Sequence, residues 1–185
     1  APAQLHRLVL ALHADAEYFV HIDAKSDLSQ FAAVLSLPNV HYIEDRVDVR
    51  WGTLREVQYQ MNLIRAAVTF PRHFDRIFFL SGMDYPLWSN ARITRWLEEQ
   101  GDREILQGFC MDTDQIEASQ KETYTVARPA FCNVRLGILA RILLRLTGYR
   151  KPMHFTVRGT EWKLYKGSAW WCISQELAVQ LLDEF

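Results

Sequence analysis

Short apolar runs rich in aromatic and β-branched residues alternate with segments of helical periodicity along the first 110 residues. The apolar runs predict strands over 18–22, 40–43, 77–80 and 105–110. The periodic segments, in which apolar residues recur every three or four positions, predict helices over 5–12, 28–35, 53–68 and 91–100. Strands and helices in alternation indicate an α/β fold, and we expect a mainly parallel central sheet flanked by helices.

The composition is that of a globular protein. Of 185 residues, 49% are hydrophobic, and only eight are Gly and six Pro, which is far from a disordered composition. This length predicts a single domain over 1–185. Because 21 basic residues are balanced by 22 acidic ones, no overall positive field would attract nucleic acid. No run of about 18 apolar residues occurs, so we expect no transmembrane helix.

The cysteine and histidine patterns favour neither a disulfide framework nor a metal site. Cys110, Cys132 and Cys172 are widely spaced and form no C-x-x-C pair, which predicts reduced thiols in an intracellular protein. The six histidines form no H-x-H or H-x-x-x-H pair. With no signal-peptide layout and no N-x-[ST] sequon, the sequence favours a cytoplasmic location.

The segment 135–150 combines four arginines with a wide leucine and isoleucine stripe. Such a basic amphipathic helix either packs its stripe into the core with the arginines solvated, or lies on an anionic membrane surface. We favour the core-packing interpretation and keep peripheral membrane contact through 135–151 as the alternative.

Two acidic turns follow predicted strands, and ligands of parallel α/β sheets bind outside the carboxyl ends of strands. Asp23 follows the run 18–22, and Asp84 follows 77–80. A carboxylate at Asp23 could accept hydrogen bonds from a ribose hydroxyl or a uracil N–H, with Lys25 near phosphate. On the chemistry of these residues alone we favour an ordinary solvated turn, since Asp, Ser and Lys are common there.

Two further patterns each have two interpretations. The Asp112-Thr113-Asp114 triplet could hold a divalent cation, but such triplets are frequent by chance, and we favour an acidic loop. Trp51 and the aromatic block 162–171 could stack on sugars or bases, or could pack in the core. The chain has no P-loop, G-x-G-x-x-G or G-x-S-x-G motif. The sequence therefore lacks the motifs typical of kinases, dinucleotide-binding enzymes and hydrolases with a catalytic triad.

Four blocks, taken together and in order, resemble the core-2/I-branching family of glycosyltransferases. They are YFVHIDAKSD (18–27), VRWGTLREVQ (49–58), FDRIFFLSGMDYPLWS (74–89) and YKGSAWWCIS (165–174). The family includes β-1,6-N-acetylglucosaminyltransferases and protein xylosyltransferases. The resemblance implies a GT-A type, Rossmann-like nucleotide-binding fold and an inverting, metal-independent enzyme with a UDP-sugar donor and no required cofactor.

The resemblance also implies site residues. The donor nucleotide maps to Asp23, Ala24, Lys25 and Trp51. The diphosphate and transferred sugar map to Ser81, Gly82, Asp84, Tyr85, Lys166, Gly167, Ser168 and Trp170. No metal ligand is expected, and Gln107 is a guess for the acceptor site.

Two departures from the family pattern concern the ends of the chain. The family's first strand, of the type A-Y-x-I-x-x-H, would precede Ala1, and its catalytic Glu, in a P-[DA]-E block, would follow Phe185. We therefore expect a domain incomplete at both ends, whose catalytic base is unknown. Glu161 is an outside candidate for that base.

The function that the resemblance implies is transfer of a sugar, first N-acetylglucosamine, from a UDP-sugar to a hydroxyl of a glycan or glycoprotein acceptor. Xylose is the alternative donor sugar. A carbohydrate-binding module without catalysis is the alternative from another class. A flavodoxin-like signalling domain is a third alternative. Such a domain would lack the W-G motif at 51–52 and the G-S-x-W motif at 167–170.

Overall fold

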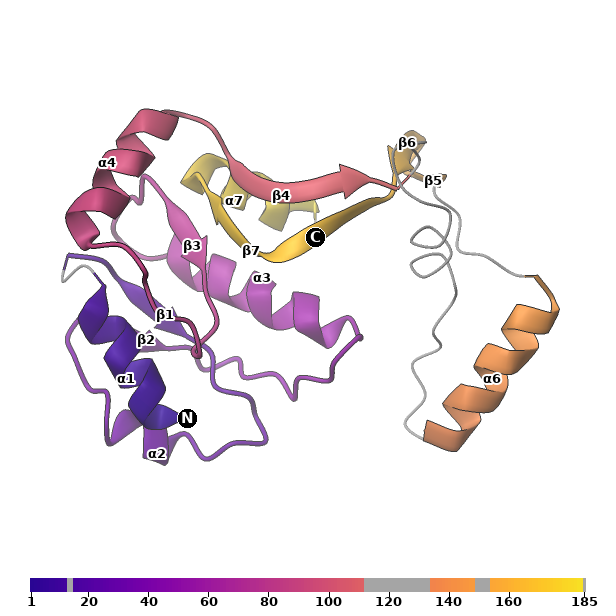
Figure 1. Cartoon of the computed structure of the whole chain (residues 1–185), viewed down its shortest axis with the longest axis horizontal. Helices are drawn as coiled ribbons and strands as arrows, with labels where there is room; N and C mark the ends of the chain where they lie inside the picture. The colour runs from indigo at the N-terminus through magenta and orange to yellow at the C-terminus, as the bar shows by residue number, and fades with distance from the viewer. Residues whose placement is uncertain (13–14, 112–133, 149–153, 185) are drawn as a thin grey trace. The chain divides into compact units, whose positions relative to one another are not determined.

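The computed structural model describes residues 1–12, 15–111, 134–148 and 154–184. The chain divides into two compact units, the first comprising Ala1–Leu106 with Ala169–Phe185 and the second Gln107–Ser168 (Figure 1). Each unit is described by itself. The extent of the domain stays a prediction.

The expected order of helices and strands is confirmed in the first unit, with boundaries displaced by a few residues. Its elements are α1 (Pro2–Ala11), β1 (Tyr18–Val20), α2 (Ser29–Ala32), β2 (Val40–Tyr42), α3 (Arg55–Val68), β3 (Ile77–Phe79), α4 (Asn90–Gln100) and α7 (Gln175–Glu184). The remaining elements are β4 (Ile105–Cys110), α6 (Val134–Leu146), β5 (His154–Val157), β6 (Thr160–Lys163) and β7 (Tyr165–Ile173).

The expectation of a mainly parallel central sheet is wrong for the residues that the structure describes. Of the strand pairs whose register is described, only β1 and β2 pair in parallel, with Phe19 opposite His41. Strand β3 pairs antiparallel with β7, which lies between β3 and β4 (Figure 1). Because β7 has no clean apolar alternation, sequence analysis did not identify it as the strand that separates β3 from β4, and its insertion makes the fold mixed α/β.

Two apolar clusters hold the first unit together. One joins α1 to the β1–β2 pair through Leu5, Val9, Val20, Ile22 and Leu35. The other packs α3 and α7 against β7 through Met61, Ile64, Ile173 and Ala178. Full burial of a Leu- or Ile-sized side chain contributes about 1.5–3 kcal/mol. These clusters therefore fix the strands whose ends carry the predicted site residues.

Helix α7 begins at a polar anchor. The Glu104 carboxylate accepts a 2.8 Å hydrogen bond from the Ser174 amide and a 2.5 Å bond from the Ser174 hydroxyl. The Ser174 Oγ in turn accepts the Leu177 N–H at 3.1 Å, which caps the helix. Arg76 Nη1 lies 3.8 Å from Glu104.

The second unit contains the β5–β6 hairpin and α6. Arg158 (φ 50°) and Gly159 (φ 82°) form the two-residue turn of the hairpin, a conformation that favours hairpin closure. Among the α6 side chains that the structure describes, Ile138, Leu139, Ile142, Leu143 and Leu146 are exposed. Among the described residues no helix is long and apolar enough to cross a bilayer. Membrane contact through 135–151 stays a prediction, and 149–151 lie outside the described residues.

The thiols of Cys110 and Cys172 are unpaired, as expected, and Cys132 lies outside the described residues. Burial raises the pKa of the Cys172 thiol to about 11, so it is protonated and unreactive at neutral pH.

Candidate functional site

The loop after β1 is held against the segment 46–49 by hydrogen bonds from both sides. The Ala24 amide donates to the Val47 carbonyl at 3.0 Å, and the Val47 amide donates to His21 Nε2 at 2.9 Å. Arg46 donates to the backbone carbonyls of Ile22 (2.9 Å) and Asp23 (2.8 Å). The backbone around Asp23 is therefore fixed before any ligand arrives.

Asp23 and Lys25 form an ionic cluster with Asp48. Lys25 Nζ donates to Asp23 Oδ2 (2.9 Å), Asp48 Oδ1 (2.7 Å) and the Val49 carbonyl (2.6 Å). The Lys25 amide also donates to Asp23 Oδ1 at 3.0 Å. Since an ammonium group has three donors, all three are used within the protein. Lys25 thus braces the two carboxylates and the 48–49 backbone.

Asp23 is held in its ionised form. Partial desolvation alone would raise the pKa of this carboxyl, but hydrogen bonds from the Lys25 side chain and from the Lys25 and Val49 backbone outweigh it and hold the pKa below its usual value. At neutral pH Asp23 can therefore only accept hydrogen bonds. Its side chain is 31% exposed, which leaves room for a donor from outside the protein.

Trp51 is presented by the turn that begins α3. Gly52 (φ 73°) adopts a left-handed conformation, and its amide donates to Glu56 Oε2 at 2.8 Å. The Thr53 hydroxyl accepts the Arg55 amide at 3.3 Å. The indole itself is 84% exposed, so it contributes little to the core and offers a face for stacking.

The turn after β3 is joined to β7 through Asp84. Asp84 Oδ2 accepts the Ser81 amide at 2.7 Å and the Trp170 Nε1–H at 2.8 Å. The Asp84 amide closes the turn onto the Ser81 carbonyl at 3.0 Å. Two predicted site segments, which lie 86 residues apart in the sequence, are therefore brought together.

Tyr85 and Gly82 complete this turn. The Arg7 guanidinium lies 5.5 Å from the centroid of the Tyr85 ring, so α1 contacts the turn. A Cβ at Gly82 would meet Leu5 Cδ1 at 3.8 Å, which is an ordinary contact. Gly82 is therefore not required by packing at this position.

In the second unit, Gln107 lies on β4, Lys166, Gly167 and Ser168 lie on β7, and Glu161 lies on β6. A Cβ on Gly108 would come within 3.1 Å of the Lys166 carbonyl, and one on Gly167 within 3.3 Å of the Gln107 carbonyl. Glycine at 108 and 167 thus permits close backbone approach. The Met111 amide donates to the Leu164 carbonyl at 2.8 Å.

The other predicted residues of this unit are solvent-accessible. Lys166 Nζ donates to the Gly167 carbonyl at 2.9 Å, and Gln107 is exposed. Ser168 is half-buried on β7. Glu161 lies on β6 with its side chain 73% exposed, and its Oε1 is 3.5 Å from His154 Nδ1.

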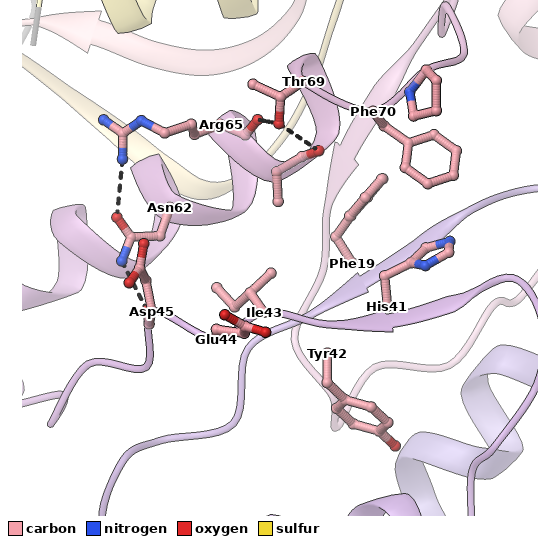
Figure 2. A pocket seen from close by; sticks show the side chains of 12 residues that line it. Phe19, His41, Tyr42, Ile43, Glu44, Asp45, Asn62, Arg65, Thr69 and Phe70 are labelled. Atoms are coloured by element: carbon pink, nitrogen blue, oxygen red, sulfur yellow. Dashed lines mark hydrogen bonds between the residues drawn. The ribbon is translucent and has the colours of Figure 1, made fainter.

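The groove shown in Figure 2 lies at β1, β2 and α3 and contains none of the predicted residues. Its volume is about 420 Å³. Phe19, His41 and Phe70 form one wall, and His41 Nε2 is 2.7 Å from Glu17. On the other wall, Asn62 donates to the Asp45 carbonyl at 2.9 Å. Because these polar groups already bind one another, the groove does not define the candidate site.

Sequence analysis missed Arg46 and Asp48. Each lies 20 or more residues from its partner in the Asp23 loop, and neither belongs to a recognisable motif. Their proximity to the W-G block was the only signal that could have found them. Within the described ranges no cluster of three His, Cys, Asp or Glu side chains could hold a metal ion. Asp112 and Asp114 lie outside those ranges.

The fold and these clusters define a mixed α/β protein with polar groups gathered just past two strand ends. A family model described as "Branch: Core-2/I-Branching enzyme" matches residues 3–184. The chain therefore belongs to the core-2/I-branching enzyme family.

Curated relatives of this chain are distant. A human β-1,3-galactosyl-O-glycosyl-glycoprotein β-1,6-N-acetylglucosaminyltransferase is 24% identical over 184 residues, 97% of this chain and 39% of that protein. A xylosyltransferase of Ciona intestinalis is 23% identical over 121 residues, and xylosyltransferase oxt of Drosophila melanogaster 24% over 122 residues. Each of these two alignments covers 63% of this chain and 14% of the relative. The chain thus spans between 14% and 39% of the length of these relatives.

Proposed function

We propose that this chain carries the donor-binding part of an inverting, metal-independent glycosyltransferase with a GT-A type fold that uses a UDP-sugar. The observation that carries the proposal is the ionised, partly exposed Asp23, which Lys25 and Val49 hold in place just past the end of β1. A carboxylate there accepts hydrogen bonds from a ribose hydroxyl or a uracil N–H. Trp51, three residues beyond Asp48, supplies an exposed aromatic face.

Lys25 acts in this proposal as a brace. All three donors of its ammonium group are bound by protein oxygens, so it keeps Asp23 ionised and oriented and does not reach for phosphate. Offsetting the diphosphate charge falls instead to other groups, of which Lys166 is the predicted one. The turn at Ser81 and Asp84, linked to Trp170, would lie against the diphosphate and the transferred sugar.

The chemistry is a direct displacement. A general base takes the proton of an acceptor hydroxyl, the hydroxyl oxygen forms a bond to the anomeric carbon, and the bond from that carbon to the UDP oxygen breaks with inversion. Cationic groups stabilise the negative charge that develops on the departing diphosphate. The base is assigned to no residue, because Glu161, the outside candidate, lies exposed on the β5–β6 hairpin beside His154.

N-acetylglucosamine is the first donor sugar to test, and xylose is the second. The relative aligned over most of this chain is an N-acetylglucosaminyltransferase by name, whereas two others are xylosyltransferases. A glycan or glycoprotein is the corresponding acceptor class. A non-catalytic carbohydrate-binding module remains the competing function, since Trp51 and Trp170 are both exposed.

Calorimetric titration with UDP tests the donor site. We expect binding in EDTA, and we expect Asp23→Ala to weaken it by about 1–3 kcal/mol, because the bound nucleotide loses a charged hydrogen-bond acceptor. Asp27→Ala is the matched control. Asp27 lies in the same loop but bonds only Ser29 and Gln30 among the described residues, so its loss should leave UDP affinity unchanged.

Three results would overturn the proposal or part of it. Equal UDP affinity of wild type and Asp23→Ala would remove Asp23 from the site. Binding only with manganese, abolished by the Asp112→Ala and Asp114→Ala pair, would replace metal independence with a cation site. Binding of sugars without any binding of UDP would favour the carbohydrate-binding module, because such a module needs no nucleotide site.

A further inference from the structure

A second groove, of about 410 Å³, lies over the first turns of α4 and the two residues before it. Trp88, Ser89, Arg92, Arg95, Trp96 and Glu99 line it. These positions recur at helical spacing, so they form one face of α4. None of them belongs to the predicted donor site, although Trp88 follows the Ser81–Pro86 turn directly in the chain.

The two tryptophans contact each other edge to face, and Arg92 lies over the Trp88 ring. The Arg92 guanidinium lies 4.2 Å from the centroid of the Trp88 ring. The Trp88 and Trp96 rings are 6.2 Å apart with an interplanar angle of 70°. A guanidinium stacked on an aromatic ring keeps its in-plane N–H groups free for other partners. The contact with Trp88 therefore orients the N–H edge of Arg92. Because Arg92 is already ordered, little of its side-chain entropy is lost when a ligand binds.

The positive charge of this groove is not neutralised by the part of the chain that the structure describes. Neither Arg92 nor Arg95 has an ion pair there, whereas Arg50, Arg72 and Arg76 each pair with a carboxylate. Glu99 forms no ion pair with Arg95 within the same ranges. Ser89, the N-cap of α4, makes no side-chain cap hydrogen bond, so the positive end of the helix dipole adds to the charge of the arginines.

We propose that the α4 groove, defined by Trp88, Arg92, Arg95 and Trp96, binds an acidic saccharide. The arginines would hold a carboxylate or a sulfate ester through paired N–H···O bonds, and the tryptophan rings would pack on the apolar face of the sugar ring. The choice of a saccharide rests on the proposed glycosyl transfer. The site would select acceptors whose chain carries an acidic sugar.

The test uses a heparin-derived tetrasaccharide and three derivatives of it, one desulfated, one carboxyl-reduced and one with both changes. Calorimetry on the full chain should give at least about tenfold tighter binding of the acidic tetrasaccharide than of the neutral one, as expected for one charge-assisted contact. The two single derivatives tell whether sulfate or carboxylate is recognised. Arg92→Gln and Arg95→Gln should each weaken the acidic ligand about tenfold.

Arg65→Gln is the matched control, because Arg65 is an exposed arginine on α3 whose guanidinium contacts only Asn62 among the described residues. It removes the same charge and should change affinity less than about twofold. Equal binding of the acidic and neutral tetrasaccharides, or wild-type affinity in both variants, would overturn the proposal. Displacement of the tetrasaccharide by an equal concentration of inorganic sulfate would reduce the groove to an anion site, which also overturns it.

UDP titration of the same samples separates this proposal from the donor site. Loss of UDP binding in Asp23→Ala with unchanged tetrasaccharide binding supports two independent sites. Failure of wild type to bind UDP, with selective tetrasaccharide binding intact, rejects the proposed donor site of this chain and leaves the acidic-saccharide groove standing.

Discussion

The contact between Asp84 and Trp170 gives the sharpest test of how the strand-end turn is built. We expect Trp170→Phe to lower the free energy of unfolding by about 1 kcal/mol. A hydrogen bond to a charged group is worth about 1.5–3 kcal/mol, and this one must be discounted because water can replace the indole N–H at a side chain that is 54% exposed. Phenylalanine keeps most of the apolar ring contact, so the change isolates the N–H donor.

A double-mutant cycle with Asp84→Asn measures the coupling directly. Asp84 accepts both the Trp170 N–H and the Ser81 amide, so Asp84→Asn alone should cost more than Trp170→Phe alone. The double variant should fall short of the sum of the two single effects by about 1 kcal/mol, because the contact is lost only once. Urea unfolding followed by circular dichroism provides the three values.

Trp162→Phe is the control for loss of an indole. Trp162 is 46% exposed on β6 and donates to no carboxylate among the described residues, so its replacement should cost less than about 0.5 kcal/mol. A coupling energy below about 0.3 kcal/mol in the cycle would refute the reasoning, because independent sites are additive within that range.

Three further outcomes are expected. Ser174→Ala removes the α7 cap and the hydroxyl bond to Glu104, and should lower the urea unfolding free energy by about 2 kcal/mol; a loss below about 0.5 kcal/mol would contradict the anchor. Ile173→Ala, at a side chain 1% exposed, should cost about 3 kcal/mol and Ile173→Val about 1 kcal/mol; equal costs would argue against close packing there. Burial lowers the pKa of His21, whose Nε2 accepts the Val47 amide, so the unfolded chain binds the proton more readily and stability should fall as the pH drops below 6.5. His21→Asn should flatten that slope in unfolding measured from pH 7 to pH 5.

Much of the secondary structure was predictable because the buried face of a helix or strand requires apolar residues at a regular spacing in the sequence. The three- and four-residue spacing from Leu54 to Val68 marks the face of α3 that Met61 and Ile64 bury, and the structure has that helix from Arg55 to Val68. The apolar runs at 18–22 and 77–80 identified β1 and β3 for the same reason. Their ends placed Asp23 and Asp84 at strand termini.

The sheet topology was not predictable in this way. Alternation shows that strands exist, but the partner of a strand is set by packing between segments far apart in the chain. Strand β7 pairs Ile173 with Ile77 and Trp171 with Phe79, which makes the central pairing antiparallel. The sequence around 165–173 mixes Lys, Gly and Ser with aromatic residues, so it has no alternation of apolar and polar residues that would predict a strand there.

By itself the sequence determined which residue types stand at the strand ends and therefore which chemistry the site could offer. Only the tertiary structure decided which partners each of them has. Lys25 was expected near phosphate, yet Asp48 and Val49, from a segment more than 20 residues away, take two of its donors and make it a brace. Asp84 likewise acquires the Trp170 indole from across the sheet. A residue's chemistry is local, but its partners are fixed by the packing of the whole fold, because hydrogen-bond donors bind whatever acceptors the fold brings within reach.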